Sequence, residues 1–233
     1  MKPFKFKQFE IQQSENVFRV GTDGVLLGAL ANVENAANVL EVGTGTGLIS
    51  LMLAQRNSIA EFLGMDINEE AVSLTKVNFE NAPFCLRLKN IHQDFKTFNT
   101  LTKFDLIVSN PPYFEESESG KDKIARQTVE LNFEQLIAKA SGVLSDRGLL
   151  SVIIPVEAGN IFVTIAEEYG LHLIRRVNIS GIESSRIKRL ILEFSGVKQQ
   201  LHESDFIIEK SPRKYSDQYL ELTKEFHVFK NKN

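Results

Sequence analysis

The sequence has little cysteine and no long apolar run. With one cysteine, Cys85, among 233 residues, the chain cannot form an internal disulfide, which favours a reducing compartment. Nowhere do about 18 apolar residues follow one another, as a transmembrane helix requires. The start, MKPFKFKQFE, also lacks the apolar stretch of a signal peptide. We therefore expect a soluble protein of the cytoplasm that does not contact a membrane.

Metal-binding residues are also few and scattered. His92, His172, His202, His227 and Cys85 lie far apart, without the close pairs that metal sites use. The sequence therefore predicts no metal site. The chain is 42% hydrophobic and 24% charged, which is enough to bury one sizeable core, so we expect a single domain over residues 1–233.

Charge is unevenly distributed along the chain. The net charge of -3 argues at first against a nucleic-acid partner. Counting Lys and Arg against Asp and Glu, however, residues 1–20 carry +2, residues 170–233 carry +4 and the middle carries -9. Charge runs are usually solvated faces, but the basic ends can also contact phosphates. The clusters are Lys2, Lys5 and Lys7, the run Arg186 to Arg189, and the run Lys210 to Lys214.

Strand and helix patterns alternate through most of the chain. Short strands are expected at 4–11 and 17–20, followed by a helix that ends near Ala31 and is capped by Thr22 or Asp23. The alternation predicts an α/β fold with a doubly wound parallel sheet, and 190–194 is expected to pair antiparallel at its edge. The other expected strands are 38–42, 61–65, 86–91, 105–109, 149–154 and 171–177, and the other expected helices are 48–56, 68–81, 132–144 and 156–169.

A glycine-rich turn joins the strand at 38–42 to the following helix. Gly43, Gly45 and Gly47 alternate with Thr44 and Thr46, which lets the backbone turn tightly and lets a ligand approach the main chain closely. The spacing is GxGxG, whereas a dinucleotide site uses GxGxxG and holds a pyrophosphate at the helix N-terminus. The turn therefore favours a ligand other than a dinucleotide.

Three acidic residues accompany this turn. Glu41 precedes it, Asp66 ends the next strand and Asp94 follows the third. Taken singly, each acid is a strand-end cap or a surface charge. As a set they would repel a diphosphate and suit an ammonium, a sulfonium, a ribose diol and an adenine amino group, which together describe S-adenosylmethionine. Asp66 is placed to accept both ribose hydroxyls, and Asp94 to accept the adenine amino group, with Phe95 or Ile67 against the ring.

A second motif ends the strand at 105–109. Asn110, Pro111, Pro112 and Tyr113 place a carboxamide, a rigid turn and an aromatic ring at the strand end. Because proline removes backbone donors, the carbonyl groups here can accept hydrogen bonds from a planar amino group. An isolated Asn-Pro-Pro-aromatic sequence is equally well explained as a proline turn with a core tyrosine. Together with the acids, it predicts the catalytic group of an amine methyltransferase.

These motifs, EVGTGTG, Asp66, Asp94 and NPPY, resemble the Rossmann-fold S-adenosylmethionine-dependent amino-methyltransferases. FRVGTDGVLLGALA, ARQTVELNFEQLI and YLELTKEFHVF resemble more closely the bacterial adenine-N6 methyltransferases of valine tRNA. The resemblance implies a class I methyltransferase fold: a seven-stranded, mostly parallel sheet, its last strand antiparallel, with helices on both faces. It divides the chain into an extension (1–20), a catalytic core (21–195) and a second extension (196–233). The implied cofactor residues are Thr22, Asp23, Glu41, Gly43, Thr44, Gly45, Gly47, Asp66, Ile67, Asp94, Phe95 and Asn110.

The resemblance also implies the reaction. We expect a monomer that methylates N6 of an unpaired adenine in the anticodon stem-loop of valine tRNA, with the NPPY residues in the catalytic site. A guanine-N2 methyltransferase of ribosomal RNA and a protein-glutamine N5 methyltransferase would use the same amine chemistry and remain alternatives. An NAD-dependent oxidoreductase lacks support, because the glycine spacing differs and no Tyr-x-x-x-Lys pair is present. A catalytically inactive nucleic-acid-binding module would have no reason to keep the full set of motifs.

Overall fold

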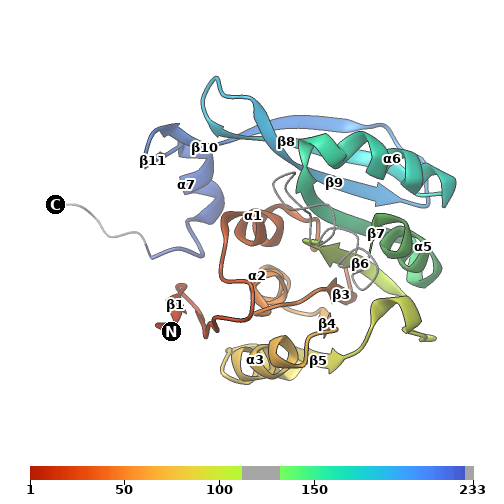
Figure 1. Cartoon of the computed structure of the whole chain (residues 1–233), viewed down its shortest axis with the longest axis horizontal. Helices are drawn as coiled ribbons and strands as arrows, with labels where there is room; N and C mark the ends of the chain where they lie inside the picture. Colours follow the sequence, from red (N-terminus) through yellow and green to blue (C-terminus); the bar gives the residue numbers. More distant parts are fainter. Residues whose placement is uncertain (112–131, 229–233) are drawn as a thin grey trace, which may run out of the picture.

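A computed structural model of the chain describes residues 1–111 and 132–228 (Figure 1). The described residues form a nine-stranded sheet in the order β11, β10, β8, β9, β7, β6, β3, β4, β5. The strands are β3 (Asn38–Val42), β4 (Glu61–Asp66), β5 (Leu88–His92), β6 (Phe104–Ser109), β7 (Leu144–Pro155), β8 (His172–Ile182), β9 (Ile187–Ser195), β10 (His202–Ser211) and β11 (Lys214–Tyr215).

Helices cover both faces of the sheet, as Figure 1 shows. Four of them pack against one hydrophobic cluster and two against the other. The α/β fold with helices on both faces is therefore confirmed. None of the described helices has the length and apolar character needed to cross a lipid bilayer. The first group is α1 (Thr22–Leu30), α2 (Leu48–Arg56), α3 (Glu69–Glu80) and α7 (Asp217–Thr223); the second is α5 (Phe133–Val143) and α6 (Gly159–Glu168).

Successive residues of the central strands enter different clusters. Leu106 and Val108 of β6 belong to the cluster under α1 and α2, whereas Ile107 between them belongs to the cluster under α5 and α6. All three side chains are fully buried. Because side chains alternate across a strand, a strand buried on both faces reads as a continuous apolar run rather than an alternating one. This explains why β6 appears in the sequence as the uninterrupted stretch LIV.

The position of β9 differs from expectation. The antiparallel direction of this strand was predicted correctly, but its position at the edge was wrong: it lies inside the sheet, between β7 and β8. Two further strands then extend the sheet. β10 runs parallel to β8, and β11 pairs with β10 as the outermost strand. The seven-stranded core implied by the resemblance is thus enlarged to nine strands by the C-terminal extension.

Three local predictions also need correction. Residues 17–20 form no strand, and the N-terminal strands are the short pair β1 (Phe4–Lys5) and β2 (Glu10–Ile11). Helix α1 is not capped by Thr22 or Asp23, because its N-cap is Gly21, which lacks a side chain. The strand expected at 86–91 begins two residues later, since Cys85–Arg87 forms a 3-10 turn before β5.

The two ends of the described chain pack together. Phe6 pairs through a β-bridge with His227, and their rings stack with centroids 5.5 Å apart. The Phe9 ring also stacks on Phe6, and the Tyr219 hydroxyl group of α7 forms a 3.2 Å hydrogen bond with the His227 ring nitrogen Nε2. Burial lowers the pKa of His227, which favours its neutral form in this aromatic cluster. The N-terminal strands and α7 therefore stabilise one another.

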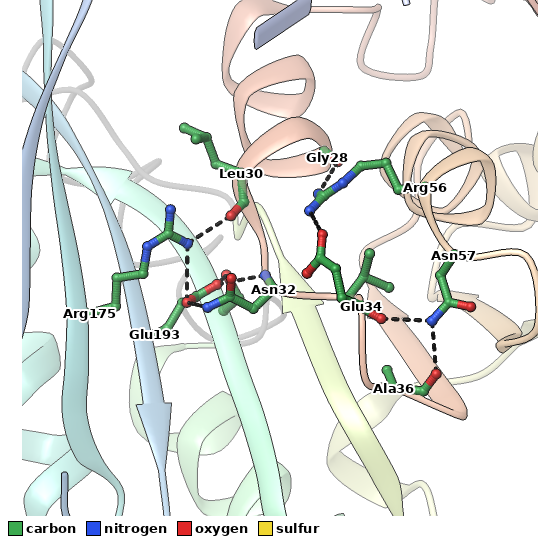
Figure 2. Close-up of polar contacts among 11 residues, drawn as sticks. Gly28, Leu30, Asn32, Glu34, Ala36, Arg56, Asn57, Arg175 and Glu193 are labelled. Carbon is green, nitrogen blue, oxygen red and sulfur yellow. Dashed lines mark hydrogen bonds and ion pairs between the residues drawn. The ribbon is translucent and has the colours of Figure 1, made fainter. Parts of the chain in front are cut away.

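A buried carboxylate fixes the C-terminal end of α1 to the sheet. Glu193 of β9 is 0% exposed, and it accepts hydrogen bonds from the Asn32 backbone N–H (2.9 Å) and from Asn32 Nδ2 (2.6 Å). Arg175 of β8 lies 3.2 Å from Glu193 Oε2 and donates to the Leu30 carbonyl oxygen at 2.7 Å, as Figure 2 shows. A charge buried this deeply is tolerated only when it is paired and hydrogen-bonded.

This arrangement predicts an asymmetric effect of substitution. Arg175→Met leaves Glu193 buried without its cation, so the free energy of unfolding should fall by about 3 kcal/mol. Arg175→Met combined with Glu193→Met removes both charges, and the loss should be smaller than the sum of the single losses. Denaturant unfolding of the parent protein, Arg175→Met, Glu193→Met and the double variant measures both effects. Arg176→Met, which removes only a hydrogen bond to Asn178, is the control and should cost less than about 1 kcal/mol. Additive losses would contradict this assignment.

Candidate active site

Strand register gathers the predicted site residues at one edge of the sheet. Val42 of β3 pairs with Met65 of β4 and with Ser109 of β6, so these three parallel strands end side by side. The residues that follow them are therefore neighbours: the glycine turn after β3, Asp66 at the end of β4 and Asn110 after β6. Asp66 in turn pairs with His92 at the end of β5, and Asp94 follows two residues later. This carboxyl edge is where open α/β sheets bind ligands.

The glycine turn needs glycine for two different reasons. Gly43, Gly45 and Gly47 have φ angles of +75°, +55° and +80°, a left-handed region that other residues rarely adopt. At Gly47 a Cβ atom would also lie 2.6 Å from the Phe79 ring of α3. At Gly43 and Gly45 it would meet no described atom within 4 Å. The third glycine therefore permits close helix packing, whereas the first two leave open backbone that a ligand can approach.

Neighbouring strands and helices hold this turn in place. The backbone N–H groups of Gly43 and Thr44 both donate to the Met65 carbonyl oxygen, at 2.9 and 3.0 Å. From α3, Thr75 Oγ1 donates to the Gly45 carbonyl oxygen and Asn78 Nδ2 to the Thr46 carbonyl oxygen, each at 2.8 Å.

Sequence reasoning missed the two α3 residues. Thr75 and Asn78 are nearly fully buried, although both are polar, and they lie three residues apart on the packed side of the helix. Residues at this spacing are neighbours on a helix surface. Buried polar side chains are nearly always hydrogen-bonded. A polar pair on the packed face of α3 was therefore the signal that could have identified them.

Glu41 is hydrogen-bonded to the glycine turn and to the first turn of α2. Its side chain is 1% exposed, and its Oε2 atom accepts hydrogen bonds from Thr44 Oγ1 (3.0 Å), the Ser50 backbone N–H (2.9 Å) and the Ser50 hydroxyl group. Burial raises the pKa of Glu41 to about 7, although the hydrogen bonds from Ser50 and Thr44 oppose that shift. Its other oxygen, Oε1, accepts no hydrogen bond from the described residues. Glu41 thus positions the turn through one carboxylate oxygen, and its other oxygen is without a donor among the described residues.

Asp66 connects the turn to the following loop. Its Oδ2 accepts from the Gly45 backbone N–H and its Oδ1 from the Asn68 backbone N–H, both at 2.9 Å. Because each carboxylate oxygen can accept more than one hydrogen bond, both retain capacity for a pair of hydroxyl groups. Ile67 next to it is 55% exposed, and the ring of His92 contacts the Ile67 carbonyl oxygen at 2.9 Å. The carboxylate and the adjacent apolar side chain are therefore both available to a nucleoside.

Asp94 and Phe95 have different surroundings. Asp94 Oδ1 accepts from the Lys96 backbone N–H at 2.9 Å, and Lys96 Nζ lies 3.5 Å from Asp94 Oδ2. Phe95 is 3% exposed and belongs to the cluster under α5 and α6. Of the two side chains expected against an adenine ring, Ile67 is therefore the one with a free surface, and Phe95 supports the loop from within the core.

Asn110 carries an unsatisfied acceptor. Its Oδ1 atom is buried and forms no hydrogen bond within the described part of the chain. Leaving a buried polar atom unpaired costs about 1–3 kcal/mol, and a ligand that donates a hydrogen bond to it would remove this cost. Pro111 is buried next to it. Pro112 and Tyr113, the other predicted catalytic residues, lie outside the described residues.

Thr22 and Asp23 begin α1 at the same edge of the sheet. Thr22 is exposed, and Asp23 Oδ2 accepts a hydrogen bond from Arg189 Nε at 2.9 Å. Arg189 lies opposite Pro155, where β7 ends. Asp23 therefore ties the start of α1 to β9, a contact that the sequence did not reveal. Among the described residues, no group of three His, Cys, Asp or Glu side chains is arranged to hold a metal ion.

The raised pKa of Glu41 predicts a pH-dependent stability. Between its ordinary pKa of 4.5 and its folded value of about 7, the folded state binds the proton more tightly than the unfolded state. The free energy of unfolding should therefore fall as pH rises through this window, by about 3 kcal/mol in total, and level off above it. Glu41→Gln should remove this slope. Urea unfolding of both proteins from pH 5 to 8, without ligand, measures it; parallel curves would contradict the burial of an ionisable Glu41.

Comparisons with known proteins identify the family and the fold of this chain. The family model described as methyltransferase small domain matches residues 10–170. A predicted O-methyltransferase of Agrobacterium tumefaciens has a similar structure, with a TM-score of 0.70 and 18% sequence identity over 88% of this chain and 96% of that chain. At this identity the structural likeness shows the fold alone.

Two curated relatives match nearly the whole chain. Both are named tRNA1(Val) (adenine(37)-N6)-methyltransferase. The relative from Flavobacteriaceae bacterium (strain 3519-10) is 52% identical over 98% of this chain and 100% of its own length. The relative from Flavobacterium psychrophilum is 41% identical over 97% of this chain and 99% of its own. The chain therefore belongs to the methyltransferase small domain family and, within it, to the tRNA1(Val) (adenine(37)-N6)-methyltransferase family.

Proposed function

We propose that this protein transfers a methyl group from S-adenosylmethionine to N6 of adenine 37 in tRNA1(Val), the reaction for which its curated relatives are named. The observation that carries the proposal is the buried, unpaired Oδ1 atom of Asn110 beside the glycine turn. An acceptor without a donor at the end of β6 suits a substrate amino group, which brings two N–H donors.

The residues of this edge fit the cofactor. S-adenosylmethionine supplies an electrophilic methyl group on a positively charged sulfur. Asp66 would accept hydrogen bonds from the ribose hydroxyl groups, and the exposed Ile67 would contact one face of the adenine ring. The Oε1 atom of Glu41 suits the ammonium group, and Asp94 the adenine amino group. Open backbone at Gly43 and Gly45 allows the ligand to lie against the main chain.

The amine chemistry explains why Asn110 matters. The exocyclic nitrogen of adenine is a poor nucleophile because its lone pair is delocalised into the ring. Asn110 Oδ1 and the Pro111 carbonyl oxygen would each accept one N–H hydrogen bond, hold the nitrogen toward tetrahedral geometry and stabilise its developing positive charge. The nitrogen would take up the methyl group that S-adenosylmethionine supplies, with the thioether as the leaving group, and would then give up a proton to water. No strong base is required before transfer.

The same geometry restricts the substrate. The Oδ1 atom of Asn110 is buried, so a base stacked in a helix could not reach it and must be extruded or already unpaired. A loop nucleotide needs the least energy to extrude, and specific RNA recognition favours such positions. An adenine beside the anticodon satisfies this requirement. The guanine of a ribosomal RNA and the glutamine of a protein also carry an amino group. Experiment must therefore distinguish these substrates from adenine 37.

The direct test uses purified protein and labelled cofactor. Incubation with unmodified valine tRNA should place the label on N6 of adenine 37. Asn110→Ala should slow the transfer by roughly two to three powers of ten, because its oxygen is needed most in the transition state. Its cofactor affinity should change little. Ribosomal RNA and bulk protein are the parallel substrates; label on guanine, on ribosomal RNA alone or on a glutamine would overturn the assignment.

Asp66 tests the cofactor site separately. Asp66→Ala removes the carboxylate that would accept hydrogen bonds from the ribose hydroxyl groups. This loss should weaken cofactor binding by about 1.5–3 kcal/mol. Because Asp66 also accepts from the Gly45 backbone N–H, Asp66→Asn, which keeps one acceptor oxygen, should lose less. Calorimetry with S-adenosylhomocysteine, the stable product, measures all three proteins. Unchanged affinity in Asp66→Ala, or tighter binding of NAD than of S-adenosylhomocysteine, would show that the acidic residues do not bind this cofactor.

A further inference from the structure

Two turns of the C-terminal part reach the edge that carries the candidate active site. Both β7 and β8 are antiparallel to β9, so β8 runs in the direction of β6 and β7. β10 is parallel to β8, with Glu209 opposite Ile182. The turns after β8 and after β10 therefore lie on the edge where Asn110 follows β6. The Glu183 backbone N–H donates to the Glu209 carbonyl oxygen at 3.1 Å, which holds the two turns together.

These turns concentrate positive charge on an acidic protein. Residues 183–189 and 209–215 contain six basic and two acidic side chains, whereas the whole chain has a net charge of -3. Two of the six bases are ion-paired, Arg189 with Asp23 and Lys210 with Asp217. The other four are exposed and form no ion pair with any described carboxylate, so they can bind an anion without breaking an existing contact. They are Arg186 in the first turn with Lys188 at the start of β9, and Arg213 in the second turn with Lys214 at the start of β11.

The second turn is held in one conformation before any ligand binds. Arg213 has a φ of +64°, unusual for a residue other than glycine, and its backbone N–H donates to Glu209 Oε2 at 3.0 Å. The Tyr215 ring stacks on Tyr219 of α7, with centroids 4.4 Å apart and planes at 18°. The Ser216 backbone N–H donates to the Ile208 carbonyl oxygen at 2.9 Å. A turn ordered in advance loses less conformational entropy on binding.

The N-terminal lysines lie elsewhere. The N-terminal strands pack near the C-terminal end of α3, where the Phe9 ring meets the Phe84 ring edge-on at 6.1 Å. Phe84 comes just before β5, and β5 ends at His92 beside Asp66, so its start is at the opposite edge of the sheet. Lys5 is also ion-paired with Glu10 at 2.9 Å. The segment that carries Lys2, Lys5 and Lys7 is therefore near the opposite edge of the sheet, whereas the two C-terminal turns place their cations at the edge of the site.

We propose that the turns β8–β9 and β10–β11 bind the phosphate backbone of the tRNA stem next to the target loop, and that the N-terminal lysines do not. The proposal rests on the proposed function and locates its RNA contact. Neighbouring strands lie about 4.8 Å apart, so β8 is about 14 Å and β11 about 24 Å from β6 along the sheet. Contacts at this range fall on phosphates several nucleotides from the target base. They position the RNA and carry no base specificity.

The location in the sequence supports this assignment. The four unpaired cations all follow residue 170, where the match to the general methyltransferase model ends. The relatives named for tRNA methylation match 97–98% of the chain and so include this part. The match to the general methyltransferase model thus ends before these turns. The match to the relatives named for a tRNA substrate includes them.

Matched charge reversals test the proposal. The test pairs are Arg213→Glu with Lys214→Glu, and Arg186→Glu with Lys188→Glu; the control pair is Lys2→Glu with Lys7→Glu, which changes net charge equally. Titration of each full-length protein with valine tRNA at several salt concentrations measures affinity without methyl transfer. Each test pair should weaken tRNA binding about tenfold near physiological salt and reduce the salt slope by about 1.5. The control pair should behave as the parent does.

Two further readouts separate binding from folding and from chemistry. Cofactor affinity and kcat at saturating tRNA should be unchanged in the test pairs, whereas KM for tRNA should rise about tenfold, in step with the lost affinity. The neutral pair Arg213→Gln with Lys214→Gln should show a smaller effect of the same kind. Equal losses in the control pair, or no loss in the test pairs, would overturn the proposed surface. Absence of methyl transfer by the parent protein would instead overturn the proposed function, because the titration does not depend on it.

Discussion

The candidate active site depends on one backbone constraint, the left-handed conformation of the glycine turn after β3. Three glycines with positive φ in five residues turn the chain from strand into helix and leave its main chain open at the sheet edge. Such a turn has little stability of its own. It is held by hydrogen bonds from β4, α3 and the buried Glu41, and Asp66 reaches it from the end of β4. The ligand site and the packing of α2 and α3 are therefore one structure.

Two polar groups at the site lower the stability of the folded protein in the absence of a ligand. Glu41 is buried enough for its pKa to rise to about 7, and Asn110 keeps a buried oxygen without a donor among the described residues. Both groups can accept hydrogen bonds. Glu41 lies near the end of β3, and Asn110 follows β6, the strand next to β3. A ligand pair with one positive charge and one amino group would satisfy both at once. The unfavourable features of the folded protein thus indicate the charge and the donors of what it binds.

The C-terminal part of the chain has two structural tasks. On the inside, Glu193 and Arg175 connect β8 and β9 to the end of α1, the helix whose start lies at the site. On the outside, β10 and β11 widen the sheet and project cations at the same edge. Asp23 links these tasks, because it pairs with Arg189 at the base of the first basic turn. Strands β8 and β9 therefore fix α1 to the sheet, while β10 and β11 extend the basic edge next to the site.

Local patterns in the amino-acid sequence determined much of this protein. Hydrophobic periodicity and turn residues predicted most helices and strands, and the spacing of Gly43, Asp66 and Asn110 after successive strands predicted their convergence, because parallel strands end at one edge. Only the tertiary structure decided which strands β9 joins, how β10 extends the sheet, and that Thr75 and Asn78 brace the glycine turn. It also decided that Asn110 Oδ1 lies unpaired among the described residues, that Phe95 lies in the core and that Arg189 pairs with Asp23. These features depend on contacts between residues distant in the chain, and short-range periodicity carries no information about such pairings.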